Sequence, residues 1–259
     1  MIMNRLTELF AQKPGNILNI YCTAGFPKLN STKEVILALQ QHGADIIELG
    51  IPYSDPVADG SVIQQSNMTA LQNGMTIQLL FSQLGAIKDQ LTIPVVLMGY
   101  INPVLQYGVD KFCEMAASCN VAGIILPDLP MYEFEKNYKN IFRKYGLHAI
   151  FLISPLTSKE RIKKADELSG GFLYAIASSA TTGSVNTTED QQAYFTKIKN
   201  MKLNNPVLIG FGIKDKPGFD HAAAHAAGAI IGTAFISHIA TAPDINQAAG
   251  SFISAIRGN

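Results

Sequence analysis

Short runs rich in Ile, Val, Leu and aromatic residues alternate along the whole chain with longer segments of helical period. The runs are nearly continuous in apolar residues, as parallel strands buried on both faces require. They predict eight strands, over residues 17–23, 45–50, 94–100, 122–127, 147–153, 172–177, 206–210 and 229–232. The repeat of roughly 30 residues is that of serial strand–helix–strand units.

Eight such units predict an α/β fold, a single (β/α)8 TIM barrel over residues 1–259. An extra N-terminal amphipathic helix that ends at Pro14-Gly15 precedes the first strand, and a short helix over 235–240 follows the eighth. The alternative, an open doubly wound sheet, would have about six strands and a Gly-rich turn after the first. Residues 23–27 lack that glycine spacing, so the barrel is favoured.

The helices between the strands have their own boundary signals. The helical period covers residues 31–42, 76–90, 131–145 and 188–201, among others. Ser31 and Asp110 are predicted as N-caps. Gly43, Gly146 and Gly228 stand where helices should end.

Composition narrows the class of protein. With 47 % hydrophobic and 15 % charged residues, the chain can build a large core and is not disordered. Its 20 basic and 20 acidic side chains exclude a strongly electrostatic binder of nucleic acid or acidic membranes. Three cysteines without a CxxC pair indicate a reducing compartment, and no segment reaches the ~20 apolar residues of a membrane span. We expect a soluble, cytoplasmic protein.

A glutamate stands inside the second predicted strand. Both faces of a barrel strand are buried, so Glu48 would be costly there unless it had a partner or were neutral. Burial raises a carboxyl pKa toward neutrality, which suits a group that both gives and takes a proton. Its position near the carboxyl end of the strand puts it at the barrel mouth. We interpret Glu48 as a general acid/base; a salt bridge to some Lys or Arg is the alternative.

Two further carboxylates follow in the next loop. Asp59 lies four residues after Asp55, in a Pro-rich segment that ends in Gly60. A carboxylate above the barrel mouth can accept a hydrogen bond from a polar N–H group and stabilise positive charge that develops there. Asp beside Pro or Gly is also a common turn former, so that interpretation stays open. Glu48 and Asp59 together form a two-carboxylate hypothesis.

Glycines follow the last two predicted strands. Gly212 follows the seventh, and Gly232 with Thr233 ends the eighth. Glycine lets backbone N–H groups approach an anion, and the loops after strands seven and eight are the recurrent phosphate site of this barrel. The loop over residues 178–184 adds hydroxyls and Gly183, and suits a mobile lid. We predict phosphate binding here, with close helix–sheet packing as the alternative.

Other constellations carry less chemistry. His221 and His225 have the i, i+4 spacing of metal ligands, but no acidic third ligand lies nearby, and we predict no metal site. The predicted strands contain no lysine, which disfavours a Schiff-base aldolase.

One segment resembles the signature of the tryptophan synthase alpha subunit family. It reads Glu48-Leu49-Gly50-Ile51-Pro52-Tyr53-Ser54-Asp55-Pro56-Val57-Ala58-Asp59-Gly60. Supporting matches lie at residues 21–27, 98–103, 127–130 and 210–213, so the resemblance covers nearly the whole chain. It implies a carbon–carbon lyase of tryptophan biosynthesis. Such an enzyme cleaves indole-3-glycerol phosphate to indole and D-glyceraldehyde 3-phosphate by a retro-aldol reaction, with no cofactor in this chain.

The resemblance also implies individual roles. Glu48 would protonate indole C3 and take the proton of the glycerol C3′ hydroxyl, and Asp59 would hold the indole N–H. The other matched positions are Tyr100, Tyr174 and Thr182 for the substrate, and Gly183, Gly212, Gly232 and Thr233 for the phosphate.

A partner is implied as well: a β subunit that carries pyridoxal phosphate (PLP), in an α2β2 heterotetramer, which receives indole through a tunnel. The contacts would include the loops after strands two, three and six, with Pro52, Asp55 and the Asn102-Pro103 turn as predicted members. Three alternatives remain: a stand-alone indole-glycerol-phosphate lyase, another phosphosugar barrel such as an isomerase of the tryptophan or histidine pathway, and a non-catalytic activating subunit.

Three departures from the family pattern are visible. The lid, commonly Gly-Val-Thr-Gly, is Ala180-Thr181-Thr182-Gly183, with Ser178 in place of a frequent arginine. Ser61 replaces a common proline, and Phe26 a frequent aspartate. None of them changes Glu48, Asp59 or Thr182; they bear on the lid and its coupling to a partner.

Overall fold

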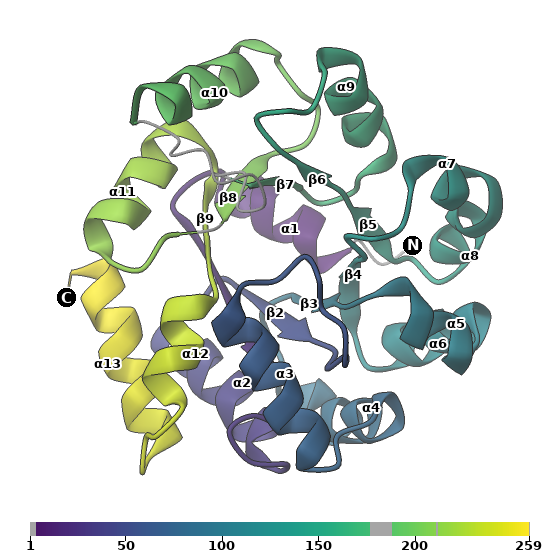
Figure 1. Ribbon diagram of the computed structural model, residues 1–259, viewed down its shortest axis with the longest axis vertical. Coiled ribbons are helices and arrows are strands. Elements are labelled where there is room, and N and C mark those ends of the chain that lie inside the picture. The colour runs from purple at the N-terminus through teal and green to yellow at the C-terminus, as the bar shows by residue number, and fades with distance from the viewer. Residues whose placement is uncertain (1–3, 177–187, 211, 259) are drawn as a thin grey trace.

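The computed structural model describes residues 4–176, 188–210 and 212–258. One parallel sheet has the strand order β5-β4-β3-β2-β1-β9-β8-β7-β6, with helices packed around its outside (Figure 1). The strands are β1 (Ile17–Thr23), β2 (Ile46–Gly50), β3 (Val95–Met98), β4 (Val121–Ile125), β5 (His148–Ile150), β6 (Leu152–Ile153), β7 (Leu173–Ile176), β8 (Val207–Gly210) and β9 (Gly228–Ile231).

The two ends of this sheet are consecutive in the chain. Phe151 alone separates β5, which pairs with β4, from β6, which pairs with β7. β5 and β6 are thus the two halves of the fifth predicted strand, and through them the sheet closes into a barrel. The predicted (β/α)8 architecture is confirmed.

The helices follow the strands in the expected alternation. They are α1 (Arg5–Gln12), α2 (Ser31–His42), α3 (Ser61–Gln72), α4 (Ile77–Gly85), α5 (Ile101–Tyr107), α6 (Val109–Ser118), α7 (Met131–Glu133), α8 (Lys139–Lys144), α9 (Lys159–Leu168), α10 (Thr188–Asn200), α11 (Lys216–His225), α12 (Thr233–Ile239) and α13 (Ile245–Arg257). The extra N-terminal helix is α1, and the short helix after the last strand is α12. Within the described residues, none of these helices is long and apolar enough to cross a membrane.

Two predicted helices are interrupted. The segment 76–90 forms α4 and a separate 3-10 turn over Lys88–Gln90. The segment 131–145 contains a π-helical turn, Phe134–Tyr138, between α7 and α8. Phe134 is buried there, with its ring edge-on to Phe142 and Phe151. Hydrophobic periodicity does not distinguish such short segments from α-helix, because over about one turn their periods depart too little from 3.6 residues.

Three predicted boundaries were wrong. The N-cap of α2 is Asn30, because Ser31 is already helical. Asp110 lies in the first turn of α6, and its carboxylate accepts hydrogen bonds from Lys144 and Tyr145 instead of capping the helix.

Gly228, the third, is the first residue of β9 and does not end a helix. A Cβ atom at this position would collide with the backbone of Ile17 in β1, so the glycine serves close strand packing. Gly43 and Gly146 do follow helices, in the left-handed backbone region at φ 99° and 68°.

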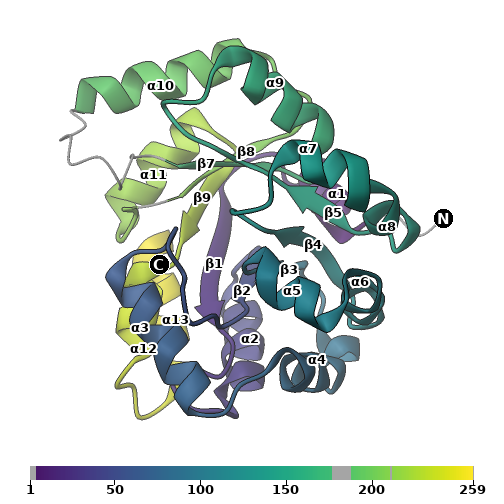
Figure 2. The ribbon, with the colours of Figure 1, turned by 45° about the vertical axis from the view of Figure 1, so that its right-hand side comes forward.

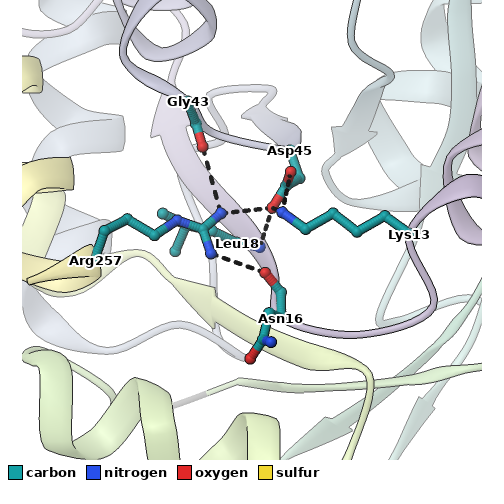
Figure 3. A network of polar contacts seen from close by, with 6 residues as sticks. All are labelled: Lys13, Asn16, Leu18, Gly43, Asp45 and Arg257. Atoms are coloured by element: carbon teal, nitrogen blue, oxygen red, sulfur yellow. Dashed lines mark hydrogen bonds and ion pairs between the residues drawn. The ribbon is translucent and has the colours of Figure 1, made fainter. Parts of the chain in front are cut away.

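A polar network joins the N-terminal ends of β1 and β2, the ends away from the carboxyl ends of the strands (Figure 3). Asp45, just before β2, accepts from Lys13 Nζ at 2.6 Å and from an Arg257 guanidinium nitrogen at 2.6 Å. Its Oδ2 also accepts the backbone N–H of Leu18 at 2.8 Å, and Arg257 donates to the carbonyl of Asn16. One carboxylate therefore ties the segments next to α1 and within α13 to β1 and β2. We call Lys13, Asp45 and Arg257 the Asp45 network.

Candidate active site

A cavity of about 450 Å³ opens at the carboxyl ends of the strands. The loop that leads into α3 and the start of α12 both line it, and Figure 2 shows these two helices side by side on one flank of the barrel. Its lining includes six of the predicted residues: Glu48, Asp59, Tyr174, Gly212, Gly232 and Thr233. Thr182 and Gly183 lie outside the described residues. A larger hollow of about 770 Å³ between α9 and α10 contains none of the predicted residues.

Glu48 is fully buried in β2, at 0 % exposure, in register with Tyr21 of β1. Asn19 Nδ2 donates to Oε2 at 2.9 Å, whereas Oε1 has no hydrogen-bond partner among the described residues. Burial raises the pKa of Glu48 to about 8; the Asn19 bond lowers it, and the charge of Asp59 raises it. No Lys or Arg in the described part of the chain forms an ion pair with Glu48, so the structure does not support the salt-bridge alternative.

Asp59 is half-buried in the loop between β2 and α3. The hydroxyl of Tyr100 donates to Asp59 Oδ2 at 2.8 Å and accepts the backbone N–H of Ala58 at 2.9 Å. Burial raises the pKa of Asp59, and the hydrogen bond from Tyr100 lowers it. The ring of Tyr53 lies against that of Tyr100, with 5.2 Å between centroids. Tyr100 therefore contacts Asp59 and holds its loop at the mouth.

Two buried tyrosines, Tyr21 of β1 and Tyr174 of β7, complete the cavity wall beside Glu48. Each ring lies over a glycine: a Cβ atom on Gly50 would collide with the Tyr21 hydroxyl, and one on Gly210 with that of Tyr174. Burial raises the pKa of both phenols, as do the nearby carboxylates. The two tyrosines therefore stay neutral.

Sequence reasoning missed Asn19 and Tyr21. A signal was present, because Asn19, Tyr21 and Thr23 occupy alternate positions of an otherwise apolar strand. Alternate residues of a strand point to the same face, so three polar groups at that period indicate a polar stripe inside the barrel.

The other end of the cavity is built from loops after β8 and β9. Gly212 has φ 79° and open space where a Cβ would lie. Thr233 begins α12 after Gly232, where the first-turn N–H groups have no acceptor within the helix. Lys214, another residue missed from the sequence, lines the same cavity and adds a positive charge. This end suits an anionic group.

The remaining predicted residues lie elsewhere. Asp55 is exposed, accepts from the hydroxyl of Ser54 and does not line the cavity. The rings of His221 and His225 lie beside Phe195 with 4.7 Å between their centroids, tilted by 49° to each other. Across the described residues, no group of three or more His, Cys, Asp or Glu side chains could hold a metal ion.

Fold and cavity together define a (β/α)8-barrel protein with a buried carboxyl group in a cavity at the carboxyl ends of its strands. The family model described as tryptophan synthase alpha chain matches residues 8–256. The chain belongs to the tryptophan synthase alpha chain family, whose role is in tryptophan biosynthesis.

Individual relatives agree. The alpha chain of Flavobacterium johnsoniae is 49 % identical over 238 residues, 92 % of this chain and 94 % of the relative. That of Christiangramia forsetii is 45 % identical over 98 % of this chain and 99 % of its own. A crystal structure of the alpha subunit from Legionella pneumophila superposes with a TM-score of 0.90 at 34 % identity, covering 99 % of this chain and 98 % of that one.

Proposed function

We propose that this chain cleaves indole-3-glycerol phosphate to indole and D-glyceraldehyde 3-phosphate, as the alpha subunit of a tryptophan synthase. The observation that carries the proposal is Glu48. It is a fully buried carboxyl with a pKa raised to about 8, in a cavity shared with Asp59, and one of its oxygens has no hydrogen-bond partner among the described residues. Such a group exists in both protonation states near neutral pH, as acid and base catalysis by one residue requires.

The proton transfers balance on this one carboxyl. Protonated Glu48 gives its proton to indole C3, which leaves a positively charged indolenine ring. The resulting carboxylate takes the proton of the C3′ hydroxyl while the C3–C3′ bond breaks. The electron pair of the broken C3–C3′ bond returns to the ring to form indole, and C3′ becomes the aldehyde carbon of glyceraldehyde 3-phosphate. Glu48 ends protonated, ready for another cycle.

Asp59 and the glycine-rich end supply the electrostatics. Asp59 would accept the indole N–H and stabilise the charge that develops on the ring, where a dry site strengthens the attraction. The phosphate would bind near Gly212, Gly232 and Thr233, with the charge of Lys214 beside them. The family resemblance adds Thr182, Gly183 and Tyr174 to these positions.

A PLP-containing β subunit is the proposed partner, in an α2β2 heterotetramer. The support is a set of exposed apolar side chains in segments that follow four successive strand ends: Val57, Leu105, Tyr132 and Leu156. We call these four residues the apolar rim. Asp55 and Asn102 are exposed near it, whereas Pro52, also predicted as a contact, is buried within this chain. A chain in a crystal structure of tryptophan synthase from M. tuberculosis is also similar to this one, with 29 % identity and a TM-score of 0.85.

A cytoplasmic location belongs to the same proposal. Cys22, Cys113 and Cys119 are all buried free thiols, which suits a reducing compartment.

Indole release from indole-3-glycerol phosphate by the purified chain, alone and with a β subunit, tests the proposal. Glu48→Gln should lower kcat by about 100-fold or more, because the amide cannot transfer the proton. The matched control is Glu114→Gln, the same change at an exposed position of α6, which should leave kcat unchanged.

The outcomes separate the alternatives. Activation by the β subunit of more than about tenfold supports the paired enzyme, and a smaller ratio supports a stand-alone lyase. Full indole release by Glu48→Gln refutes the role of Glu48, and a Glu48→Gln chain that activates the β subunit as fully as the wild-type chain does, when neither releases indole alone, supports a non-catalytic activating subunit. No indole release by the folded chain under any condition refutes the lyase.

A further inference from the structure

Asn19 and Glu48 form a buried, hydrogen-bonded polar pair inside the barrel. Both side chains are at 0 % exposure, on neighbouring strands β1 and β2, and one hydrogen bond of 2.9 Å joins Asn19 Nδ2 to Glu48 Oε2. Asn19 lies two residues before Tyr21, so both side chains point to the same face of β1. Tyr21 lines the cavity, which puts Asn19 inside the barrel, one layer below the cavity floor.

The two oxygens of Glu48 are therefore unequal. Oε2 is tied to the barrel wall, whereas Oε1 is buried without a partner among the described residues. A fixed Oε2 also fixes the plane of the carboxyl group. We propose that Asn19 is a positioning residue that holds Oε2 of Glu48 and so leaves Oε1 as the oxygen that exchanges the proton with the substrate. The inference rests on the proposed function.

An amide fits this task better than a cation would. A paired Lys or Arg would keep Glu48 ionised, whereas a neutral N–H donor stabilises the carboxylate only modestly. Asn19 also carries an acceptor, Oδ1, that is buried and has no partner in the described structure. If its amide turns over, Oδ1 can accept the proton of neutral Glu48. One side chain can thus serve both protonation states of the acid/base.

Other titratable groups surround Glu48. Those that face the cavity or lie beside Glu48 are Tyr21, Cys22, Asp59, Tyr174 and Lys214. Burial raises the pKa values of both phenols and of the Cys22 thiol, so these groups stay neutral. The charges of Asp59 and Lys214 remain when Asn19 is replaced, so a change in the titration of Glu48 reports on the Asn19 hydrogen bond.

Asn19→Leu tests the role, because leucine has the same number and branching of side-chain heavy atoms and no hydrogen-bonding group. Loss of the bond should raise the pKa of Glu48 by about one to two pH units. The readout is the infrared difference spectrum of the Glu48 carboxyl against pH, assigned by its absence in Glu48→Gln. The limb of the pH–rate profile that depends on Glu48 should move to higher pH by the same number of pH units. We expect kcat to fall about 10- to 100-fold and KM to change less than about threefold.

The matched control is Gln83→Leu. Gln83 is a buried amide on α4 that donates to the carbonyl of Leu29 and does not line the cavity. The Gln83→Leu variant should have a lower free energy of unfolding, and the pKa of Glu48 in it should equal that in wild type. If Asn19→Leu does not fold, Asn19→Ser, whose side chain is too short to reach Oε2, makes the same measurement.

An unmoved titration of Glu48 in the folded Asn19 variant overturns the proposal, and so does a pH–rate profile that coincides with that of wild type. The spectroscopic measurement needs no turnover. A shifted titration in a chain that cleaves no substrate therefore supports the Asn19 assignment and refutes the proposed reaction.

Discussion

Opposing influences act on the carboxyl of Glu48. Burial and the charge of Asp59 favour its neutral form, and the Asn19 amide favours its ionised form. The pKa that results, about 8, lies far above the ordinary value near 4.5. The folded chain therefore binds this proton more tightly than the unfolded chain does.

This difference makes stability depend on pH. The contribution of neutral Glu48 is complete below about pH 4.5 and is lost as the pH rises through about 8. Glu48→Gln is neutral throughout, so relative to wild type it should gain a few kcal/mol of unfolding free energy between about pH 5 and pH 9. Urea unfolding of wild type and Glu48→Gln at about pH 5 and about pH 9 measures this gain. A gain equal to that of Glu114→Gln would contradict the prediction.

Tyr100 supports a second residue-scale prediction. Tyr100→Phe removes the hydroxyl that joins Asp59 to the Ala58 backbone, so Asp59 loses its donor and its loop loses a tie. We expect kcat/KM for indole-3-glycerol phosphate to fall about 10-fold, as for one hydrogen bond to a charged group. Tyr53→Phe, which removes a hydroxyl from the adjacent ring, is the control. Equal losses in the two variants would contradict the assignment.

The sequence predicted some residues of the site better than others. Glu48 was predictable because a charged residue in a buried strand demands an explanation. Asn19 was not identified, because a buried amide on β1 gains meaning only from its register with β2, a long-range pairing. The contact of Tyr100 with Asp59 likewise depends on how the loop between β2 and α3 folds back over the barrel.

Among the elements, β1, β2 and α13 meet at the Asp45 network, on the face opposite the cavity. Asp45 is 15 % and Arg257 19 % exposed, so their ion pair is only weakly screened by water. The network fixes the N-terminal ends of β1 and β2, whose carboxyl ends carry Tyr21 and Glu48. Stability and chemistry thus depend on opposite ends of the same strands.

Arg257→Met should therefore reduce the unfolding free energy by about 1–3 kcal/mol and leave kcat unchanged. Denaturant unfolding together with the indole assay measures both quantities. Lys164→Met, which removes an exposed ion pair with Glu135, should cost less stability. A loss of kcat in folded Arg257→Met would show that the two ends are coupled.

The elements themselves were largely predictable. Strands buried on both faces leave a continuous apolar signature, and all eight runs were found. Helix boundaries were less certain: Gly228 has the residue type of a helix end but sits in a strand, because only glycine clears Ile17. That collision involves residues more than two hundred positions apart, so no local pattern reveals it.

At the scale of the whole molecule, the apolar rim follows the carboxyl ends of four successive strands, the end of the barrel at which the cavity with Glu48 opens, and Val57 of the rim also lines that cavity. Apolar side chains as exposed as Tyr132 (66 %) and Leu156 (77 %) suit a surface that another protein covers. A partner bound there would lie at the same end of the barrel as the cavity, as the proposed transfer of indole to a β subunit requires.

Leu156→Asp should weaken association with the β subunit by about 10-fold or more, because a buried charge without a partner opposes binding. Titration calorimetry measures the affinity, and the activity of the chain alone should not change. Met68→Asp, an exposed apolar position on α3 outside the rim, is the control. Equal affinity of the two variants for the β subunit would place the interface elsewhere.

The tyrosines that lie over Gly50 and Gly210 restrict the order in which these positions can evolve. Gly50→Ala alone would force its methyl group into the Tyr21 hydroxyl, whereas Tyr21→Leu first removes the three nearest atoms that this methyl group would meet. The two substitutions are therefore epistatic, and the double variant should be more stable than the sum of the single effects implies. The same holds for Gly210 and Tyr174. In each pair, the tyrosine must be replaced by a smaller residue before the glycine can be replaced by a larger one.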